Sequence, residues 1–288
     1  MKRRAAWLML TAAAAAASSA SLAGQLAFAI AGIGVVGMLH GAGDLAVVEP
    51  AKRPAFLSAY AVVSLATMLW WTADPSVALP AFLVASAVHF GLEDAPHGSI
   101  AERGARGIAL IAAPAALHPA GYASLLRVAG GASFGVSTFT PIIAQAGGIA
   151  GTALLWLAWR RRDVRLAGGM AALLLLPPLV GFTIGFLMLH ALPQTFEHRD
   201  RLGCSTTYAY LRTVAPVFAA AVLLAGLVAV ILHHVDPSGV RGLFAGIAAL
   251  AMPHLLVTPL FEPRDAREPA GDWSRTRQDA WNRGAAHG

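Results

Sequence analysis

The stretch SLAGQLAFAIAGIGVVGMLHGAGDL, residues 21–45, decides the fold class of this chain. It has no charged residue before Asp44 and is rich in glycine, alanine and aliphatic side chains. An apolar run of about 20 residues can span the hydrocarbon core of a bilayer as one helix. Near the end of this run, His40 and Asp44 stand four residues apart, which places them on one face of a helix. The stretch therefore predicts a transmembrane helix that carries a polar pair.

Similar apolar runs recur along the whole chain. Of its 288 residues, 57% are hydrophobic and 12% are charged, whereas soluble domains carry about 25% charged residues. The mean hydropathy is +0.63. The uncharged runs are residues 5–39, 55–73, 75–88, 108–126, 141–159, 166–189, 213–232 and 243–260. Because the first run is long enough for two crossings, we predict an all-α, multi-pass transmembrane helical bundle with about eight or nine spans.

The chain divides into three regions by composition. Residues 1–23 form a basic, alanine-rich segment that is either a first span or a signal-like sequence. Residues 24–260 form the polytopic membrane domain, in which we find no domain boundary and no convincing repeat. Residues 261–288 are polar and charged, which is typical of a flexible C-terminal tail.

The basic residues indicate orientation rather than a nucleic-acid partner. The net charge is +6, but the arginines cluster at the ends of apolar runs, with no basic-aromatic stripe. The positive-inside rule predicts that residues 2–4 and 160–162 face the cytoplasm. Pro177 and Pro178 interrupt the run 166–189, so that run either crosses once or re-enters, and the side of the C-terminus stays open. We expect a multi-pass protein of the cell inner membrane, with membrane lipid as its surroundings.

Four of the ten histidines lie inside apolar runs and share a local pattern. They are His40, His89, His190 and His254. Each is followed four residues later by a polar residue, and these residues are Asp44, Glu93, Gln194 and Thr258. A polar group at that spacing lies one helical turn away, where it can orient the imidazole or a bound water. We therefore expect a polar group within reach of each imidazole, although Pro193 would distort the helix between His190 and Gln194.

A shared metal site is the interpretation that we prefer for the four histidines. Ionisable groups inside a membrane are costly and usually mark a functional site. Neutral imidazole is a common ligand of iron, zinc and copper. The alternative for any single histidine is a hydrogen bond to a neighbouring helix. His198, in a charged segment eight residues after His190, is a reserve ligand candidate.

Several other chemistries lack their sequence signatures. The chain has no H-E-x-x-H, no G-x-S-x-G, no Walker loop and no dinucleotide fingerprint, and a single cysteine, Cys204, excludes a cysteine-based cluster. Two other functions stay open on the residues alone. One is a proton-coupled transporter, which helices broken at Pro114, Pro119 and Pro177 would suit. The other is a haem b electron carrier with His40 and His190 as axial ligands.

Four short motifs resemble a known family, the Brp/Blh-type bacterial β-carotene 15,15′-dioxygenases. The motifs are HGAGDL with His40 and Asp44, HFGLED with His89 and Asp94, LMLHALPQ with His190, and MPHLLVTP with His254. They occur in the family's order over about residues 32–259. Each motif alone is weak, whereas four in order are fairly specific.

The resemblance implies an activity, a metal and a substrate. Such proteins use histidine-held Fe²⁺ and O₂ to split the central double bond of β-carotene into two retinals, which serve as rhodopsin chromophores. For this chain it implies His40, His89, His190 and His254 as iron ligands, supported by Asp44, Glu93, Asp94 and Gln194. It further implies a carotenoid substrate, O₂ and a retinal-binding rhodopsin as partners. A non-catalytic relative that assists rhodopsin assembly is the remaining alternative.

The chain departs from the family pattern at Gln194. The family's third motif has a second histidine four residues after the first, and here that position holds Gln194. An amide oxygen is a poorer iron ligand than imidazole. Either His254 completes a set of four histidines, or the site has three.

Overall fold

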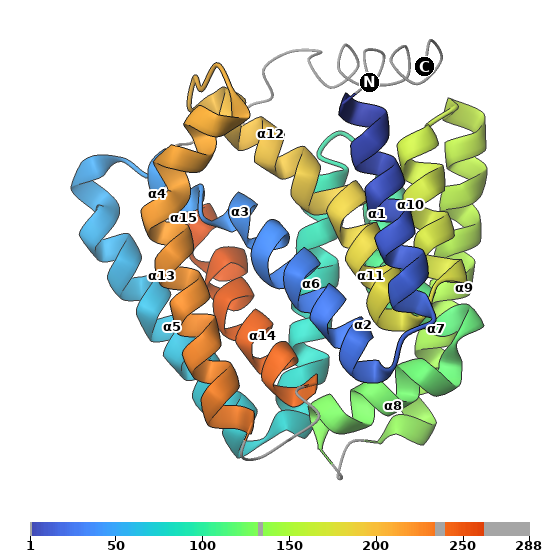
Figure 1. The fold of residues 1–288 in the computed structure, drawn as a ribbon. Coiled ribbons are helices and arrows are strands. Elements are labelled where there is room, and N and C mark those ends of the chain that lie inside the picture. Colours follow the sequence, from blue (N-terminus) through green and yellow to red (C-terminus); the bar gives the residue numbers. More distant parts are fainter. Residues whose placement is uncertain (1, 132–134, 234–239, 262–288) are drawn as a thin grey trace.

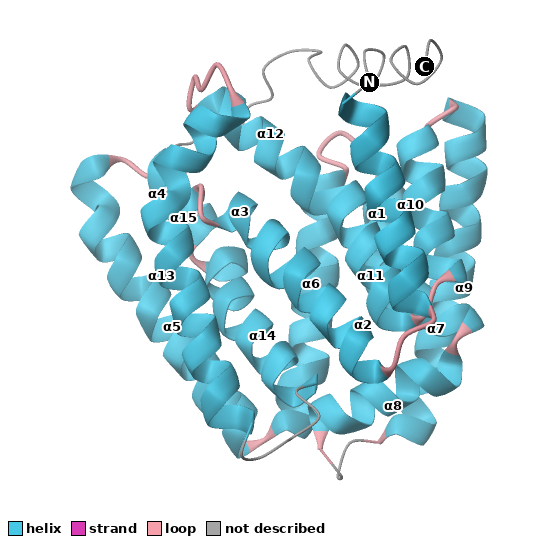
Figure 2. Cartoon of the chain, in the orientation of Figure 1, coloured by secondary structure: helices cyan, strands magenta, loops and turns pink. Residues whose placement is uncertain are grey.

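The computed structural model describes residues 2–131, 135–233 and 240–261, and these residues form helices joined by short loops (Figures 1 and 2). The polar tail expected at 261–288 lies outside the described residues, except for Phe261. The helices are α1 (Lys2–Ser18), α2 (Leu22–Ala29), η1 (Ile30–Gly37), α3 (Met38–Gly41), α4 (Asp44–Val47), η2 (Pro50–Lys52), α5 (Arg53–Ala73), α6 (Pro75–Asp94), α7 (Ile100–Leu117), α8 (Pro119–Gly130), α9 (Val136–Arg161), α10 (Val164–Leu175), α11 (Pro178–Phe186), η3 (Leu187–Ala191), α12 (Leu192–Arg201), α13 (Thr207–His233), α14 (Val240–Leu256) and α15 (Thr258–Phe261). No strand occurs among these residues.

The helices form a multi-pass membrane bundle, as predicted. Seven helical segments of the described chain are long and apolar enough to cross a bilayer, or up to eight if the bent pair α7–α8 counts as one span. Their outer faces carry large apolar side chains that are left exposed, such as Val62 at 66%, Leu65 at 61% and Leu69 at 59% on α5. In water such a surface would be unfavourable, whereas lipid tails are as apolar as these side chains.

Two broken helices pack against each other inside the bundle. The axes of α7 and α8 bend by 116° at the junction between Leu117 and Pro119. The helix pair α10–α11 turns at Leu176 and Pro177, and Pro177 cannot continue the first helix. His118 Nε2 donates a hydrogen bond to the carbonyl of Leu175, 3.2 Å away, and so ties one break to the other.

The run 166–189 re-enters rather than crossing the bundle once. In Figure 1, α10 starts at the end of the bundle that holds the N-terminus of α1, and the chain returns to that end through α11, η3 and α12. The last described helix, α15, also lies toward that end (Figure 1). The structure thereby decides a point that the apolar pattern alone left open.

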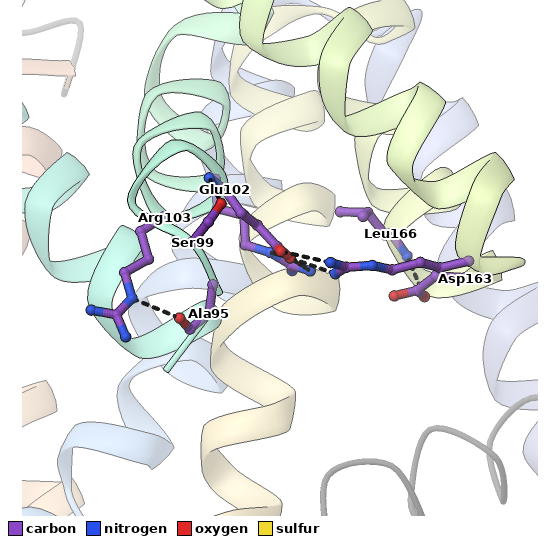
Figure 3. A network of polar contacts seen from close by, with 8 residues as sticks. Ala95, Ser99, Glu102, Arg103, Asp163 and Leu166 are labelled. Carbon is purple, nitrogen blue, oxygen red and sulfur yellow. Dashed lines mark hydrogen bonds and ion pairs between the residues drawn. The ribbon is translucent and has the colours of Figure 1, made fainter. Parts of the chain in front are cut away.

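A polar network holds the helices together at this same end (Figure 3). Glu102 on α7 accepts from Arg161 on α9 through both carboxylate oxygens, at 2.6 and 2.8 Å, and from Arg106 at 3.1 Å. Asp163 caps α10 by accepting from the backbone N–H of Leu166 at 3.0 Å. The ion pair joins α7 to α9, and α7 packs against α6, which carries His89.

Candidate metal centre

Four histidines that lie far apart in the sequence meet in the interior of the bundle. His40 comes from α3, His89 from α6, His190 from η3 and His254 from α14. Their ring centroids lie 5.0 Å apart for His40–His190, 5.2 Å for His40–His254, 5.4 Å for His89–His190 and 4.9 Å for His89–His254. All four are buried, with exposed fractions between 1% and 8%. The four imidazoles therefore form one closed ring of neighbours.

Two π-helical segments bring His40 and His190 into this ring. The segment η1 ends just before His40, and η3 contains His190. A π-helical turn holds an extra residue, so it shifts the following side chains around the helix, and such turns are frequent at functional sites. Where η1 contacts the end of α11, a Cβ on Gly37 would lie 2.6 Å from the ring of Phe186, so only glycine fits there.

Three of the histidines have their Nδ1 held by a hydrogen-bond acceptor. His40 Nδ1 donates to the carbonyl of Gly37. His190 Nδ1 donates to Asp94 at 2.9 Å, and His254 Nδ1 donates to Asp44 at 2.6 Å. An acceptor at Nδ1 places the proton there and leaves Nε2 with its lone pair, which is the usual arrangement of a metal-ligating histidine.

The Nε2 atoms indicate what the site is suited to hold. Those of His89 and His190 are fully buried and have no hydrogen-bond partner among the described residues. A buried polar atom without a partner is costly, and a bound ion is one of the explanations for it. His89, Glu93 and His254 also offer ligand atoms that all lie within 4.8 Å of one another. This donor set suits a transition metal such as iron, zinc or copper.

The carboxylates pair with histidines of other helices rather than with the histidine four residues before them. Asp44 holds His254 instead of His40, and the same Asp44 oxygen accepts from Thr258 at 2.8 Å. The prediction that the polar residue four positions on orients each imidazole is therefore wrong for His40 and for His254. Glu93 lies near its histidine, with a carboxylate oxygen 3.4 Å from His89 Nε2, but no hydrogen bond joins these two atoms.

The third histidine also differs from the predicted pattern. His190 is held by Asp94 of α6, at the far end of the HFGLED motif, rather than by Gln194. Gln194 is half-buried in α12 and is not among the residues that line the cavities beside the histidines. The supporting role predicted for Gln194 stays a prediction.

His198, the reserve ligand candidate, is buried next to the ring and forms a hydrogen bond with the backbone of one of its members. Its Nδ1 donates to the carbonyl of His40 at 3.0 Å. Tyr210 on α13, which the sequence analysis did not single out, donates from its hydroxyl to the carbonyl of Leu39 at 2.8 Å. A Cβ on Gly43 would lie 2.8 Å from both side chains, so glycine is needed for them to approach. In the sequence, Tyr210 stands just before the apolar run 213–232 and His198 stands within a charged segment, and neither position indicates these roles.

Two apolar cavities meet at the histidines. The larger, which we call the wide cavity, has a volume of about 680 Å³ and lies between η1, α5, α13 and α14. The smaller, the narrow cavity, has about 130 Å³ and lies among α6, α7, α8 and α11. His40, His254 and Phe186 line both cavities. A molecule that extends from one cavity into the other would therefore pass directly beside the imidazoles.

Residues 31–262 match the family model described as beta-carotene 15,15′-dioxygenase, and this range includes all four buried histidines. The chain belongs to this family. No curated protein and no solved structure matches it. The family assignment agrees with the resemblance carried by the histidine motifs and supports a carotenoid dioxygenase-type function for this membrane protein.

Proposed function

We propose that this family member is an iron-dependent dioxygenase of the cell inner membrane that cleaves β-carotene, or a similar carotenoid, at its central double bond. The observation that carries the proposal is the ring of four buried imidazoles at the junction of two apolar cavities. The overall reaction consumes one C=C bond and one O₂ and yields two aldehydes, which are two retinals for β-carotene. Both oxygen atoms thus appear in the products.

His40, His89, His190 and His254 would hold the iron. Asp44 and Asp94 would position two of these rings through the hydrogen bonds at Nδ1. Glu93, whose oxygen shares a ligand-sized space with His89 and His254, is the carboxylate best placed to support the metal. We assign no such part to Gln194, because it lines neither cavity.

When bound, ferrous iron would supply the binding and activation of O₂. The residues of this chain would hold the metal, exclude water and admit the substrate. Neutral imidazoles leave the positive charge of the metal uncompensated, and the apolar walls exclude water from the reacting atoms. A hydrocarbon dissolved in the bilayer would reach the histidines without being extracted into water, because the apolar helices place them within the membrane. The retinal formed would be available to a retinal-binding rhodopsin in the same membrane.

Expression in β-carotene-producing bacteria tests the proposal. Retinal measured by chromatography and iron measured per purified chain should both be present for the wild type and be lost in His40→Ala and His89→Ala. His97→Ala is the matched control, because His97 is exposed in the loop between α6 and α7. Iron without retinal would indicate a non-catalytic relative, and neither iron nor retinal would refute the proposal.

A proton-coupled transporter is the second candidate, and the broken helix pairs α7–α8 and α10–α11 are the observation that favours it. Acid-driven proton uptake into liposomes that contain the purified protein would support that function. An absence of uptake, together with retinal formation, would exclude it.

A further inference from the structure

The wide cavity is almost wholly apolar apart from the histidine site. Of the residues that line it, only His40, Asp44, Tyr60 and His254 carry a polar side chain. The Tyr60 hydroxyl is already engaged, since it donates to the carbonyl of Leu250 at 2.9 Å. An occupant therefore meets hydrocarbon walls and no charged group other than those of the metal centre. Its volume of about 680 Å³ falls within the range of sites that bind small organic molecules, about 300–1,000 Å³.

The cavity reaches the lipid-facing surface between η1 and α13. Ile30 and Val35 of η1 line it, yet 46% and 41% of their surfaces are exposed. On α13 the lining residues are small, among them Ala221, Ala225 and Gly226. Figure 1 shows α2 (blue) and α13 (orange) lying apart toward the end of the bundle that is opposite α4. Because these helices are membrane-spanning, the opening faces the acyl chains rather than water.

The wide cavity and the narrow cavity both border the histidine ring. Seven residues line both cavities, among them His40, His254 and Phe186. An elongated hydrocarbon that enters from the lipid would pass one end beside the imidazoles, and its trailing part would remain in the wide cavity. The wide cavity would hold the trailing arm of such a molecule, which leaves its central double bond beside the imidazoles.

We propose that the gap between η1 and α13 is a lateral portal through which a polyene hydrocarbon enters from the bilayer, and that the wide cavity holds one arm of it. This inference rests on the proposed function for the identity of the occupant. Three observations support it, namely the apolar lining, the continuity with the histidine ring and the partly exposed lining residues on membrane-spanning helices.

Two glycines in the cavity wall allow a direct test. A Cβ on Gly226 meets no described atom within 4 Å, and one on Gly34 meets only Ile30 of its own helical turn, at 3.8 Å. Both glycines line the wide cavity, and the fold leaves room for a Cβ at each of them. Leu227 is the matched control, because it adjoins Gly226 but lines neither cavity, and 58% of its surface is exposed.

The experiment measures β-carotene that co-purifies with the full-length chain from β-carotene-producing cells, as visible absorbance per chain. His40→Ala serves as the parent, because cleavage would otherwise consume the bound molecule. Gly226→Phe or Gly34→Phe should lower the retained β-carotene about tenfold, which corresponds to about 1.4 kcal/mol, because the added ring occupies space that the polyene needs. Leu227→Phe should retain it in full. Gly226→Leu, with a smaller side chain, covers the case in which a phenylalanine variant fails to accumulate.

A tenfold fall in either glycine variant, with Leu227→Phe unchanged, supports the portal. Equal retention in all variants overturns it, as does an equal loss in Leu227→Phe. A parent that retains no β-carotene, or that retains a phospholipid in its place, also overturns it. Retinal formation by the wild type is scored separately, so a failure of catalysis and a failure of the portal are distinguishable.

Discussion

Asp44 joins three parts of the metal centre through one side chain. It follows His40 closely in the sequence, accepts from His254 Nδ1 at 2.6 Å and accepts from Thr258 at 2.8 Å. We predict that Asp44→Asn lowers iron affinity about 10–100-fold, because the neutral amide holds the imidazole N–H less firmly. Iron retained per chain after dialysis against graded chelator measures this. Glu49→Gln, at an exposed surface ion pair, is the control and should behave as wild type. Full retention in Asp44→Asn would contradict the assignment.

Substitutions at His254 and at Gln194 should have different effects on the iron content. His254 belongs to the ring of imidazoles, whereas Gln194 lines neither cavity. We therefore expect His254→Ala to lose iron as fully as His40→Ala, and Gln194→His to leave the iron content of the wild type unchanged. Metal analysis of both purified variants decides the matter. A higher iron content in Gln194→His would show that position 194 reaches the metal after all.

The candidate site could be predicted from the sequence in its members but not in its pairings. A histidine in an apolar run is visible because burying an ionisable group there is costly. Its partner is not visible, because the spacing of four residues describes neighbours on one regular helix. Asp44 and His254 lie on different helices, and only the tertiary fold brings them together. The π-helical segment η3 also changes the face on which the residues after His190 lie.

The π-helix η1 is an element whose geometry can be tested without changing any site residue. Removing one residue from a π-helical turn restores an α-helix and rotates the side chains on one side of the deletion by about 100° relative to the other. Deletion of Val36 should therefore turn His40 away from its three neighbours and abolish iron binding, while membrane insertion persists. Iron per chain and the membrane-bound fraction are the measurements.

Deletion of Ala12 in α1 is the control for the Val36 deletion. Ala12 is exposed and lies far from the histidines in the sequence, so its removal only shifts the residues before it. Iron binding should survive that deletion. Iron binding that survives both deletions would show that η1 does not set the position of His40.

At the element scale, hydropathy predicts where helices lie but not how they are interrupted. The apolar runs anticipated the long helices, because the bilayer demands a minimum apolar length. Neither the π-helical hydrogen bonds of η1 nor the bend of 116° between α7 and α8 has a hydropathy signature. Pro119 and Pro177 stand at the two breaks. A proline alone does not predict a break, however, because α6 continues through Pro80.

At the scale of the whole molecule, the distribution of charge orients the bundle. Lys52, Arg103, Arg161 and Arg199 come from four separate connections, and all four connections lie at the end that holds the N-terminus of α1 (Figure 1). The positive-inside rule assigns such an end to the cytoplasm. The sequence predicted a cytoplasmic side for residues 2–4 and 160–162, but the run 166–189 prevented the count of crossings from reaching the last helix.

The topology leads to a prediction about the two ends of the described chain. Because α10–α12 leave and return on one side, α1 and α15 lie toward the same end of the bundle (Figure 1). We predict that a fluorescent protein fused after Phe261 is fluorescent, since it folds in the cytoplasm, and that alkaline phosphatase at that position is inactive. The same phosphatase fused after Asp74, at the opposite end between α5 and α6, should be active and serves as the control. If residues 166–189 crossed the membrane only once, the fusion after Phe261 would report the opposite side, with active phosphatase and no fluorescence.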